Sequence, residues 1–306
     1  WANFLSSDTN ATDILNDGND DPRTYLFGPF DKNAEWYVNY TDDITTTLQS
    51  GKGYRAASVT GSNITFTGSA LSNDVSIAIT TPNVIESQWN LLGNPYPSYV
   101  DAAKFLTANS GPMEDAAEAI YAYNSNTYTG GAATTGNYTI INAATISAFP
   151  GENFNIAPGQ GFFVPADITP ANFSGTVTFT TGPTAVDDMR TTSGSDDYIA
   201  GRNSDLTYVL KLGLTTNTDV TTSFFFNENA SRGLDAGYDA KAFGNTPIYS
   251  HLVEDNTGLP MALQSLSIND LSNVSVPLGV NANQGQQVTF SIALSTLPDT
   301  INVYLD

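Results

Sequence analysis

The stretch GKGYRAASVTGSNITFTG, residues 51–68, has a counterpart in GQGFFVPADITPANFSGTVTFT, residues 159–180. Each copy opens with a Gly-x-Gly-aromatic pattern and later alternates apolar residues with threonine, as Ile64-Thr65-Phe66-Thr67 and as Val177-Thr178-Phe179-Thr180. Glycine turns beside alternating apolar and β-branched residues are typical of β-structure. Because the pattern recurs after roughly 110 residues, the sequence indicates a duplicated β-scaffold, which favours binding or display over catalysis.

Further strands are expected wherever apolar and polar residues alternate or where short apolar runs lie between turn residues. A short helix is expected where Ser98 and Asp101 could form a capping box ahead of Phe105 and Leu106. Many short strands at regular spacing predict an all-β protein, built from tandem β-sandwich or jelly-roll-like units with one or two short helices. The expected strands fall at residues 75–80, 120–123, 138–141, 161–164, 208–214, 224–226, 274–278 and 288–294.

The chain of 306 residues is long enough for two or three packed units. We expect a first β-unit at 1–82, a second at 83–182 that repeats the first or is fused with it, and a linker or crossover at 183–201 rich in Thr, Ser, Gly and Asp. A C-terminal β-sandwich follows at 202–306. Because the chain begins without Met and ends within an expected strand, we interpret it as a fragment of a longer, processed protein.

Composition limits the classes of function. Charged residues make up 13% of the chain, with 31 acidic against 10 basic residues and a formal charge of −21. Such a charge repels phosphates, so nucleic-acid binding is not expected. No apolar stretch approaches the roughly 20 residues needed to cross a bilayer, so direct membrane insertion is not expected either. The chain has no cysteine, which excludes disulfides and thiol chemistry.

Catalytic groups are sparse. His251 is the only histidine, and no nucleophile-elbow spacing accompanies it. Glycoside hydrolysis requires only two carboxylates, of which the chain has many, but the sequence does not show which of them would face each other across a cleft. We therefore expect no enzyme, and the alternative of a polysaccharide-degrading domain stays open.

Aromatic residues near turns are the better candidates for ligand binding. Sugar rings stack on exposed Trp and Tyr side chains, while Asn and Asp hydrogen-bond to the hydroxyl groups. The alternative is that these rings fill the cores of the units. The expected ligand-binding residues are Trp36, Tyr37, Tyr121, Tyr123 and Tyr128.

Asp235 and Asp239 flank the turn at Gly237 and form the tightest acidic pair in the chain. Calcium prefers oxygen ligands, so the two carboxylates could share a structural Ca²⁺ with nearby carbonyls. The alternative is that the two carboxylates only stabilise the turn.

Three motifs carry a resemblance to a known class of proteins. The segment WNLLGNPYPS at residues 89–98, GQGFFV at 159–164 and GLDAGYD at 233–239 resemble modules of secreted and cell-surface proteins of Bacteroidota. Such modules lie just upstream of a C-terminal sorting domain for type IX secretion, which is absent from this sequence. The resemblance implies an extracellular or cell-surface location and contact with the secretion machinery, and it transfers no catalytic residue.

These observations lead to one hypothesis and two alternatives. The chain is expected to be a non-catalytic array of extracellular β-modules that binds polysaccharide or a cell-surface protein. One alternative is a fragment of a secreted polysaccharide-degrading enzyme. The other is a structural stalk or subunit of an extracellular assembly, in which the edge at Ile301–Leu305 accepts a strand from a partner.

Overall fold

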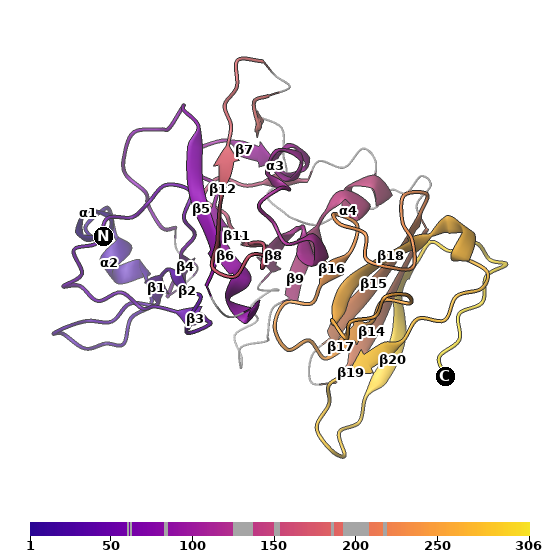
Figure 1. Cartoon of the computed structure of the whole chain (residues 1–306). Coiled ribbons are helices and arrows are strands. Elements are labelled where there is room, and N and C mark those ends of the chain that lie inside the picture. Colours follow the sequence, from indigo (N-terminus) through magenta and orange to yellow (C-terminus); the bar gives the residue numbers. More distant parts are fainter. Residues whose placement is uncertain are drawn as a thin grey trace. The chain divides into compact units, whose positions relative to one another are not determined.

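The computed structural model describes residues 1–59, 61, 63–82, 85–124, 137–149, 154–184, 187–191, 208–216 and 219–306. Short β-strands dominate, and the longest helix among the described residues, α3, has eight residues. The fold is therefore all-β, as the sequence predicts (Figure 1). The chain divides into two compact units: unit 1 comprises Trp1–Pro112 and Asn155–Asp197, and unit 2 comprises Met113–Phe154 and Tyr198–Asp306.

Unit 1 consists of small antiparallel sheets and short helices. Its sheets pair β1 with β4, β2 with β3, β5 with β12 and β6 with β11, and place β7 between β10 and β13. The elements are α1 (Ala2–Leu5), α2 (Asn10–Asp13), β1 (Phe27–Gly28), β2 (Phe30–Asp31), β3 (Trp36–Tyr37), β4 (Arg55–Ala56), β5 (Val75–Thr81), the 3-10 helix η1 (Ile85–Gln88), β6 (Trp89–Gly93), β7 (Tyr99–Asp101), α3 (Ala102–Asn109), β10 (Asn155–Ile156), β11 (Gly161–Pro165), β12 (Phe173–Phe179) and β13 (Arg190–Thr191).

An aromatic core holds the N-terminal part of unit 1 together. The rings of Trp1 and Phe27 stack with centroids 4.8 Å apart, and those of Phe27 and Tyr54 stack at 5.5 Å. Phe4 and Tyr40 close the cluster around them. Since large aromatic side chains bury much apolar surface each, this cluster stabilises a region whose strands have only two residues apiece.

The two copies of the glycine motif both lie against β6. Gly53 donates its N–H to the carbonyl of Leu91, and β11 pairs with β6 so that Gly161 lies opposite Gly93. The strands expected at 75–80 and 161–164 are confirmed as β5 and β11. The strand expectation fails at Ile64–Thr67, which form no strand among the described residues.

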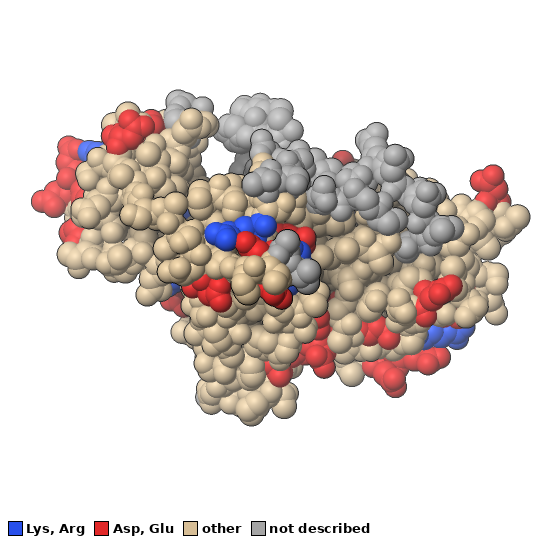
Figure 2. Space-filling model, turned by 90° about the horizontal axis from the view of Figure 1, so that it is seen from above, with Lys and Arg blue, Asp and Glu red and all other residues tan. Residues whose placement is uncertain are grey.

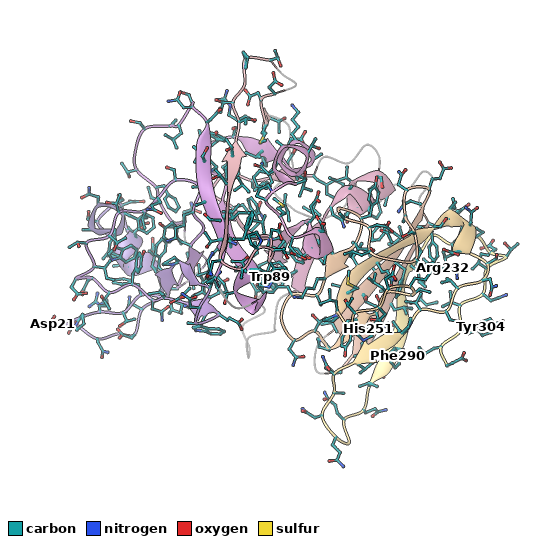
Figure 3. The ribbon with its side chains drawn as sticks, viewed as in Figure 1. Asp21, Trp89, Arg232, His251, Phe290 and Tyr304 are labelled. Atoms are coloured by element: carbon teal, nitrogen blue, oxygen red, sulfur yellow. The ribbon has the colours of Figure 1, made fainter. Side chains whose placement is uncertain are left out.

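The segment from Trp89 to Ser98 is a structural corner. Trp89 is buried (Figure 3), and the Asn94 side chain accepts the N–H of Tyr96 and donates to the carbonyls of Ser98 and Ile156. Such an Asx turn, together with the two prolines, ends β6 and redirects the chain.

The expected short helix is confirmed as α3, but its cap differs from the expectation. Asp101, rather than Ser98, is the N-cap, and its carboxylate accepts the N–H of Lys104 at 3.1 Å. The Ser98 hydroxyl is buried and has no hydrogen-bond partner among the described residues. The chain continues as a strand through β7, which delays the helix by three residues.

Unit 2 is built on one large sheet. Its strand order is β19-β17-β18-β15-β14-β20, with β16 also paired to β18 (Figure 1). Antiparallel β8 and β9 form a further pair. The elements are η2 (Asp115–Ala117), β8 (Ile120–Asn124), β9 (Asn137–Ile141), α4 (Ala143–Ala148), β14 (Tyr208–Thr215), β15 (Asp219–Asn227), β16 (Ala240–Lys241), β17 (Ile248–Ser250), β18 (Met261–Ser267), η3 (Ile268–Asp270), β19 (Leu278–Val280) and β20 (Thr289–Ser295).

The central strands of this sheet are buried on both faces. Phe224, Phe225 and Phe226 of β15 are all buried, as their uninterrupted apolar run predicts. β15 runs parallel to β18 and antiparallel to β14. The expected strand at 274–278 is wrong for residues 274–277, and residues 301–306 form no strand either.

The two units do not coincide with the divisions expected from the sequence at residues 82 and 182. Each unit contains two separate segments of the chain, and the first segment of unit 2 lies within the sequence between the two segments of unit 1. Periodicity predicts local strands but does not show which segments pack together. Units built from alternating segments of the chain therefore cannot be predicted from it.

Candidate functional site

The hairpin β2–β3 of unit 1 places several polar and aromatic side chains next to each other. Phe30 lies opposite Tyr37, and Asp31 lies opposite Trp36. The Asp31 carboxylate accepts the N–H of Asn33 at 2.9 Å, which fixes the connecting turn. We refer to Asp31, Lys32, Asn33, Trp36 and Tyr37 as the hairpin site.

Trp36 is the most exposed aromatic residue of the hairpin, with 67% of its surface accessible. Its ring meets the neighbouring Tyr37 edge to face at 6.4 Å. Tyr37 is held in place by the edge of Phe30 at 5.5 Å and by the Arg55 guanidinium, which lies 4.6 Å above the ring centroid. A supported Tyr beside an exposed Trp is a surface on which a flat apolar face can stack.

A cavity of about 470 Å³ opens beside this hairpin. Asp31 is the one carboxylate among the described residues that line it. The lining residues are Pro29, Phe30, Asp31, Lys32, Asn33, Val38, Thr80 and Pro82. The depression is shallow and largely open to solvent, and its lining combines apolar walls with a few polar groups.

Lys32 anchors the hairpin to the neighbouring strands. Its ammonium donates to the carbonyl of Thr80 at 2.9 Å, to the Thr80 hydroxyl at 2.7 Å and to the Asn90 side-chain oxygen. Burial, and then the charge of Lys52, lower the pKa of Lys32 to about 8. Since all three N–H donors are occupied, the ammonium positions the hairpin and is not free to act as a nucleophile.

The aromatic residues expected to bind ligand in unit 2 have different environments. Tyr121 is completely buried and donates its hydroxyl to the Lys241 carbonyl at 2.9 Å, so its ring has no exposed face, contrary to the expectation. Burial raises the pKa of that hydroxyl. Tyr123 is half exposed and meets Tyr138 edge to face at 5.5 Å. Tyr128 lies outside the described residues.

Asp235 and Asp239 both accept hydrogen bonds around the turn between them. The Asp235 carboxylate accepts the N–H of Ser231 at 2.6 Å and its hydroxyl at 3.0 Å. Asp239 is fully buried and accepts the N–H groups of Ser265 and Asp235, at 2.7 and 2.8 Å. Each of the four carboxylate oxygens therefore has a hydrogen-bond donor within the turn or the neighbouring strand.

Desolvation raises the pKa of Asp239 to about 7. The two backbone N–H groups partly offset this rise, and the charge of Asp235 adds to it. The pKa of Glu118 is also raised, mainly because the carboxyl is buried and to a smaller extent by the charge of Asp115. No group of three or more His, Asp or Glu residues in the described part of the chain is arranged to hold a metal ion.

His251 is held by a backbone contact. Its Nδ1 lies 3.0 Å from the carbonyl oxygen of Leu259, and its ring meets that of Tyr249 edge to face at 5.3 Å (Figure 3). Both contacts are structural in character, and neither supplies the nucleophile that a histidine base would activate.

A family model for a domain of unknown function, DUF8693, matches residues 5–305, almost the whole chain. The chain belongs to the DUF8693 family. No curated protein matches, and no solved structure matches. Among the described residues of this DUF8693 chain, no helix is long and apolar enough to span a membrane.

The sequence analysis named Trp36 and Tyr37 of this DUF8693 chain as ligand-binding residues and did not name Asp31, Lys32 and Asn33, which lie on the same hairpin. The missed residues lie in a DKN turn between two aromatic residues, a composition that signals a hairpin connection. What the sequence could not show is that β5 contributes Thr80 to the same cavity, because that contact joins residues 48 positions apart.

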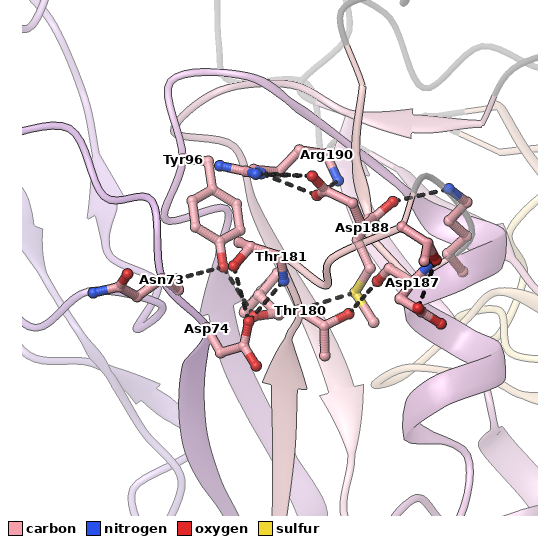
Figure 4. Close-up of polar contacts among 12 residues, drawn as sticks. Asn73, Asp74, Tyr96, Thr180, Thr181, Asp187, Asp188 and Arg190 are labelled. Carbon is pink, nitrogen blue, oxygen red and sulfur yellow. Dashed lines mark hydrogen bonds and ion pairs between the residues drawn. The ribbon is translucent and has the colours of Figure 1, made fainter.

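A second polar cluster of the DUF8693 chain was also missed (Figure 4). The Tyr96 hydroxyl donates to the carbonyls of Asn73 and Phe179, while Arg190 forms a two-pronged ion pair with Asp188. The Arg190 guanidinium lies 5.7 Å from the Tyr96 ring centroid. Burial is the main cause that raises the pKa of Tyr96 to about 12. These internal bonds make the cluster part of the scaffold of unit 1.

Proposed function

We propose that this DUF8693 chain is a non-catalytic β-module of an extracellular or cell-surface protein, and that it binds polysaccharide through the hairpin site. One observation carries the proposal: Trp36, 67% exposed, lies on a short hairpin whose turn lines a cavity with Asp31, Lys32 and Asn33. An exposed indole presents the face on which a sugar ring stacks, and the carboxylate and amide beside it match sugar hydroxyl groups.

The chemistry of the hairpin cavity favours binding over hydrolysis. Glycosidases that use the common mechanism need two carboxyl groups on either side of the scissile bond. The described lining of this cavity contributes Asp31 alone. The lysine that borders it is bound to Thr80 and Asn90.

The proposed location rests on composition and on the sequence resemblance to modules exported by type IX secretion. Figure 2 shows acidic side chains spread over this face of the molecule and few basic ones, in keeping with the net charge of −21. Such a surface stays soluble and repels anionic lipids and nucleic acids. A polysaccharide or a cell-surface protein is the partner that fits it.

The binding test compares two single substitutions in unit 1. Trp36→Ala removes the exposed ring of the hairpin site, and Phe66→Ala removes a ring with 66% exposure outside it. On an array of purified polysaccharides, we expect wild-type chain and Phe66→Ala to be retained equally. The affinity of Trp36→Ala is expected to fall by about 5- to 30-fold, since a ring that stacks on a sugar is worth roughly 1–2 kcal/mol. Equal retention of all three proteins would contradict the assignment of the site.

The same array separates the alternatives. Retention without released reducing or unsaturated ends is expected for a binding module, whereas released ends would identify an enzyme. Repeating the measurement with EDTA tests the proposed structural Ca²⁺ at Asp235 and Asp239. Unchanged retention and unchanged thermal stability in EDTA would rule out that cation.

A further inference from the structure

The two faces of the β2–β3 hairpin carry different side chains. Directly paired residues of an antiparallel ladder project to the same side, so Asp31 and Trp36 share one face of the hairpin, and Phe30 and Tyr37 share the other. On the second face the Arg55 guanidinium already lies over the Tyr37 ring. On the first face the indole of Trp36 is 67% exposed, so a ligand that stacks on it also meets Asp31.

One carboxylate oxygen of Asp31 is available on that face. Its Oδ1 accepts the N–H groups of Asn33 and Ala34, at 2.9 and 3.4 Å. Its Oδ2 accepts no hydrogen bond, and the carboxylate forms no ion pair, in the part of the chain that the structure describes. Paired residues of an antiparallel ladder have Cβ atoms about 5 Å apart, so a group that rests on the indole of Trp36 lies within reach of this oxygen.

The cations of the hairpin are directed away from this face. Lys32 donates its three N–H groups to Thr80 of β5 and Asn90 of β6. Arg55 lies over Tyr37 on the opposite face of the hairpin. The charged group that a ligand meets beside the exposed indole is therefore a carboxylate.

The charges around the turn favour a positively charged ligand further. The turn DKNAEW, residues 31–36, has two carboxylates, Asp31 and Glu35, against the ammonium of Lys32. Glu35 is exposed, precedes Trp36 directly and has no ion-pair partner among the described residues. The whole chain carries a formal charge of −21, which attracts cations and repels anions before they reach the site.

A positively charged sugar matches both groups of this face. An ammonium group is attracted by the face of an indole and forms an ion pair with a carboxylate. The groups that give a polysaccharide positive charge are free amino groups, as in units of glucosamine. Building on the proposed function, we propose that the ligand of the hairpin site is a polysaccharide with free amino groups, whose ring stacks on Trp36 while its ammonium group binds the carboxylate of Asp31.

Two oligosaccharides of equal length test the charge of the ligand. Oligomers of glucosamine and of N-acetylglucosamine differ in the acetyl group that removes the positive charge. By titration calorimetry we expect the chain to bind the glucosamine oligomer about 3- to 30-fold more tightly, the combined effect of one exposed cation–π contact and one exposed ion pair. The preference is expected to decrease between about 0.05 and about 0.5 M sodium chloride, because salt screens exposed charges. Trp36→Ala is expected to weaken the binding of both oligomers.

Two substitutions of equal charge test the role of Asp31. Asp31→Asn removes the charge but keeps an oxygen that accepts the N–H of Asn33, so the turn is preserved. Asp167→Asn is the matched control: Asp167 accepts the N–H of Thr169 at 2.9 Å in the same way and is not among the described residues that line the cavity. We expect Asp31→Asn to bind the glucosamine oligomer about 2- to 5-fold more weakly and the N-acetylated oligomer unchanged. Asp167→Asn is expected to bind both as the wild type does.

The outcomes separate this inference from the proposed function. Equal affinity for the two oligomers, with both lost in Trp36→Ala, would overturn the preference for amino groups and leave a polysaccharide site. Tighter binding of an oligomer of uronic acid would do the same. A preference for glucosamine that decreases equally in Asp31→Asn and Asp167→Asn would show that the net charge of the chain, and not Asp31, selects the ligand. A chain that binds no oligosaccharide or polysaccharide would overturn both the inference and the proposed function.

Discussion

At the scale of single residues, Asp239 is a carboxyl that folding removes from water. It is fully buried in unit 2, and its pKa is raised to about 7 by desolvation even though two backbone N–H groups bind its oxygens. Folding therefore strengthens proton binding by this carboxyl relative to the unfolded chain, where the ordinary value is 3.8. The stability of the protein must then depend on pH in the interval between those two values.

The sign of this dependence follows from linkage. Below pH 4 the carboxyl is protonated in both states, and above pH 7 it is ionised in both, with the folded state bearing the cost of a buried charge. The free energy of unfolding of the wild type is expected to fall by up to about 4 kcal/mol, at 1.36 kcal/mol per pKa unit, as the pH rises through this interval. Urea unfolding at pH 5, 6, 7 and 8 measures it.

Asp239→Asn is the control for that measurement. The amide cannot ionise, and its NH₂ group would face one of the two backbone donors, so we expect a loss of about 1–3 kcal/mol at pH 5. The difference in the free energy of unfolding between wild type and Asp239→Asn should decrease as the pH rises to 8. A gap of constant size would show that Asp239 does not titrate in this range.

The same residues show why the sequence predicted the functional site less well than it predicted the fold. A pair of aspartates around a glycine has one appearance whether the carboxylates bind calcium or backbone N–H groups. Tyr121 likewise alternates with its neighbours as a surface residue would, and only its packing in the folded chain buries it. Trp36 remained exposed because its strand has two residues and no layer covers it among the described elements.

At the scale of elements, β6 is the strand that both copies of the glycine motif contact. Gly51 accepts the N–H of Gly93 and Gly53 donates to Leu91, while β11 pairs with the same strand. The two glycine motifs therefore support one strand from two sides. The sequence predicted the repetition, but it could not predict that both copies meet at β6, since pairing between distant segments leaves no periodic signal.

The two equivalent glycines differ in how closely β6 approaches them. A Cβ at Gly53 would lie 2.4 Å from the Leu92 carbonyl oxygen, whereas at Gly161 its nearest neighbour, the same oxygen, would be 3.5 Å away. Gly53→Ala is expected to lower the free energy of unfolding by about 1–3 kcal/mol, because backbone must move. Gly161→Ala is expected to change it by less than about 1 kcal/mol. Chemical unfolding of both variants measures these changes. Equal losses of unfolding free energy in the two variants would contradict the closer approach of β6 to Gly53.

At the scale of the whole molecule, local strands were predictable and their grouping was not. The alternations at Val75–Thr81 and Thr289–Ser295 became strands β5 and β20. Yet unit 2 takes Met113–Phe154 from the middle of the chain, where the sequence suggested part of a separate repeat. Which residues share a core depends on contacts between remote segments, and alternation along one segment carries no information about them.

This interleaving leads to a prediction about fragments. Residues 202–306 include the large sheet of unit 2 but lack β8, β9 and α4. Without them Phe243 loses the ring of Tyr138, 4.4 Å away, and Gly237 loses the hydrogen bond from Ala143. We expect this fragment to show no cooperative unfolding and poorly dispersed amide resonances. Residues 113–154 joined to 198–306 by a flexible Gly/Ser linker should restore both signals, because they supply the missing part of the same core. A sharp thermal transition in the shorter fragment alone would show instead that the large sheet is an independent folding unit and that the middle segment only docks onto it.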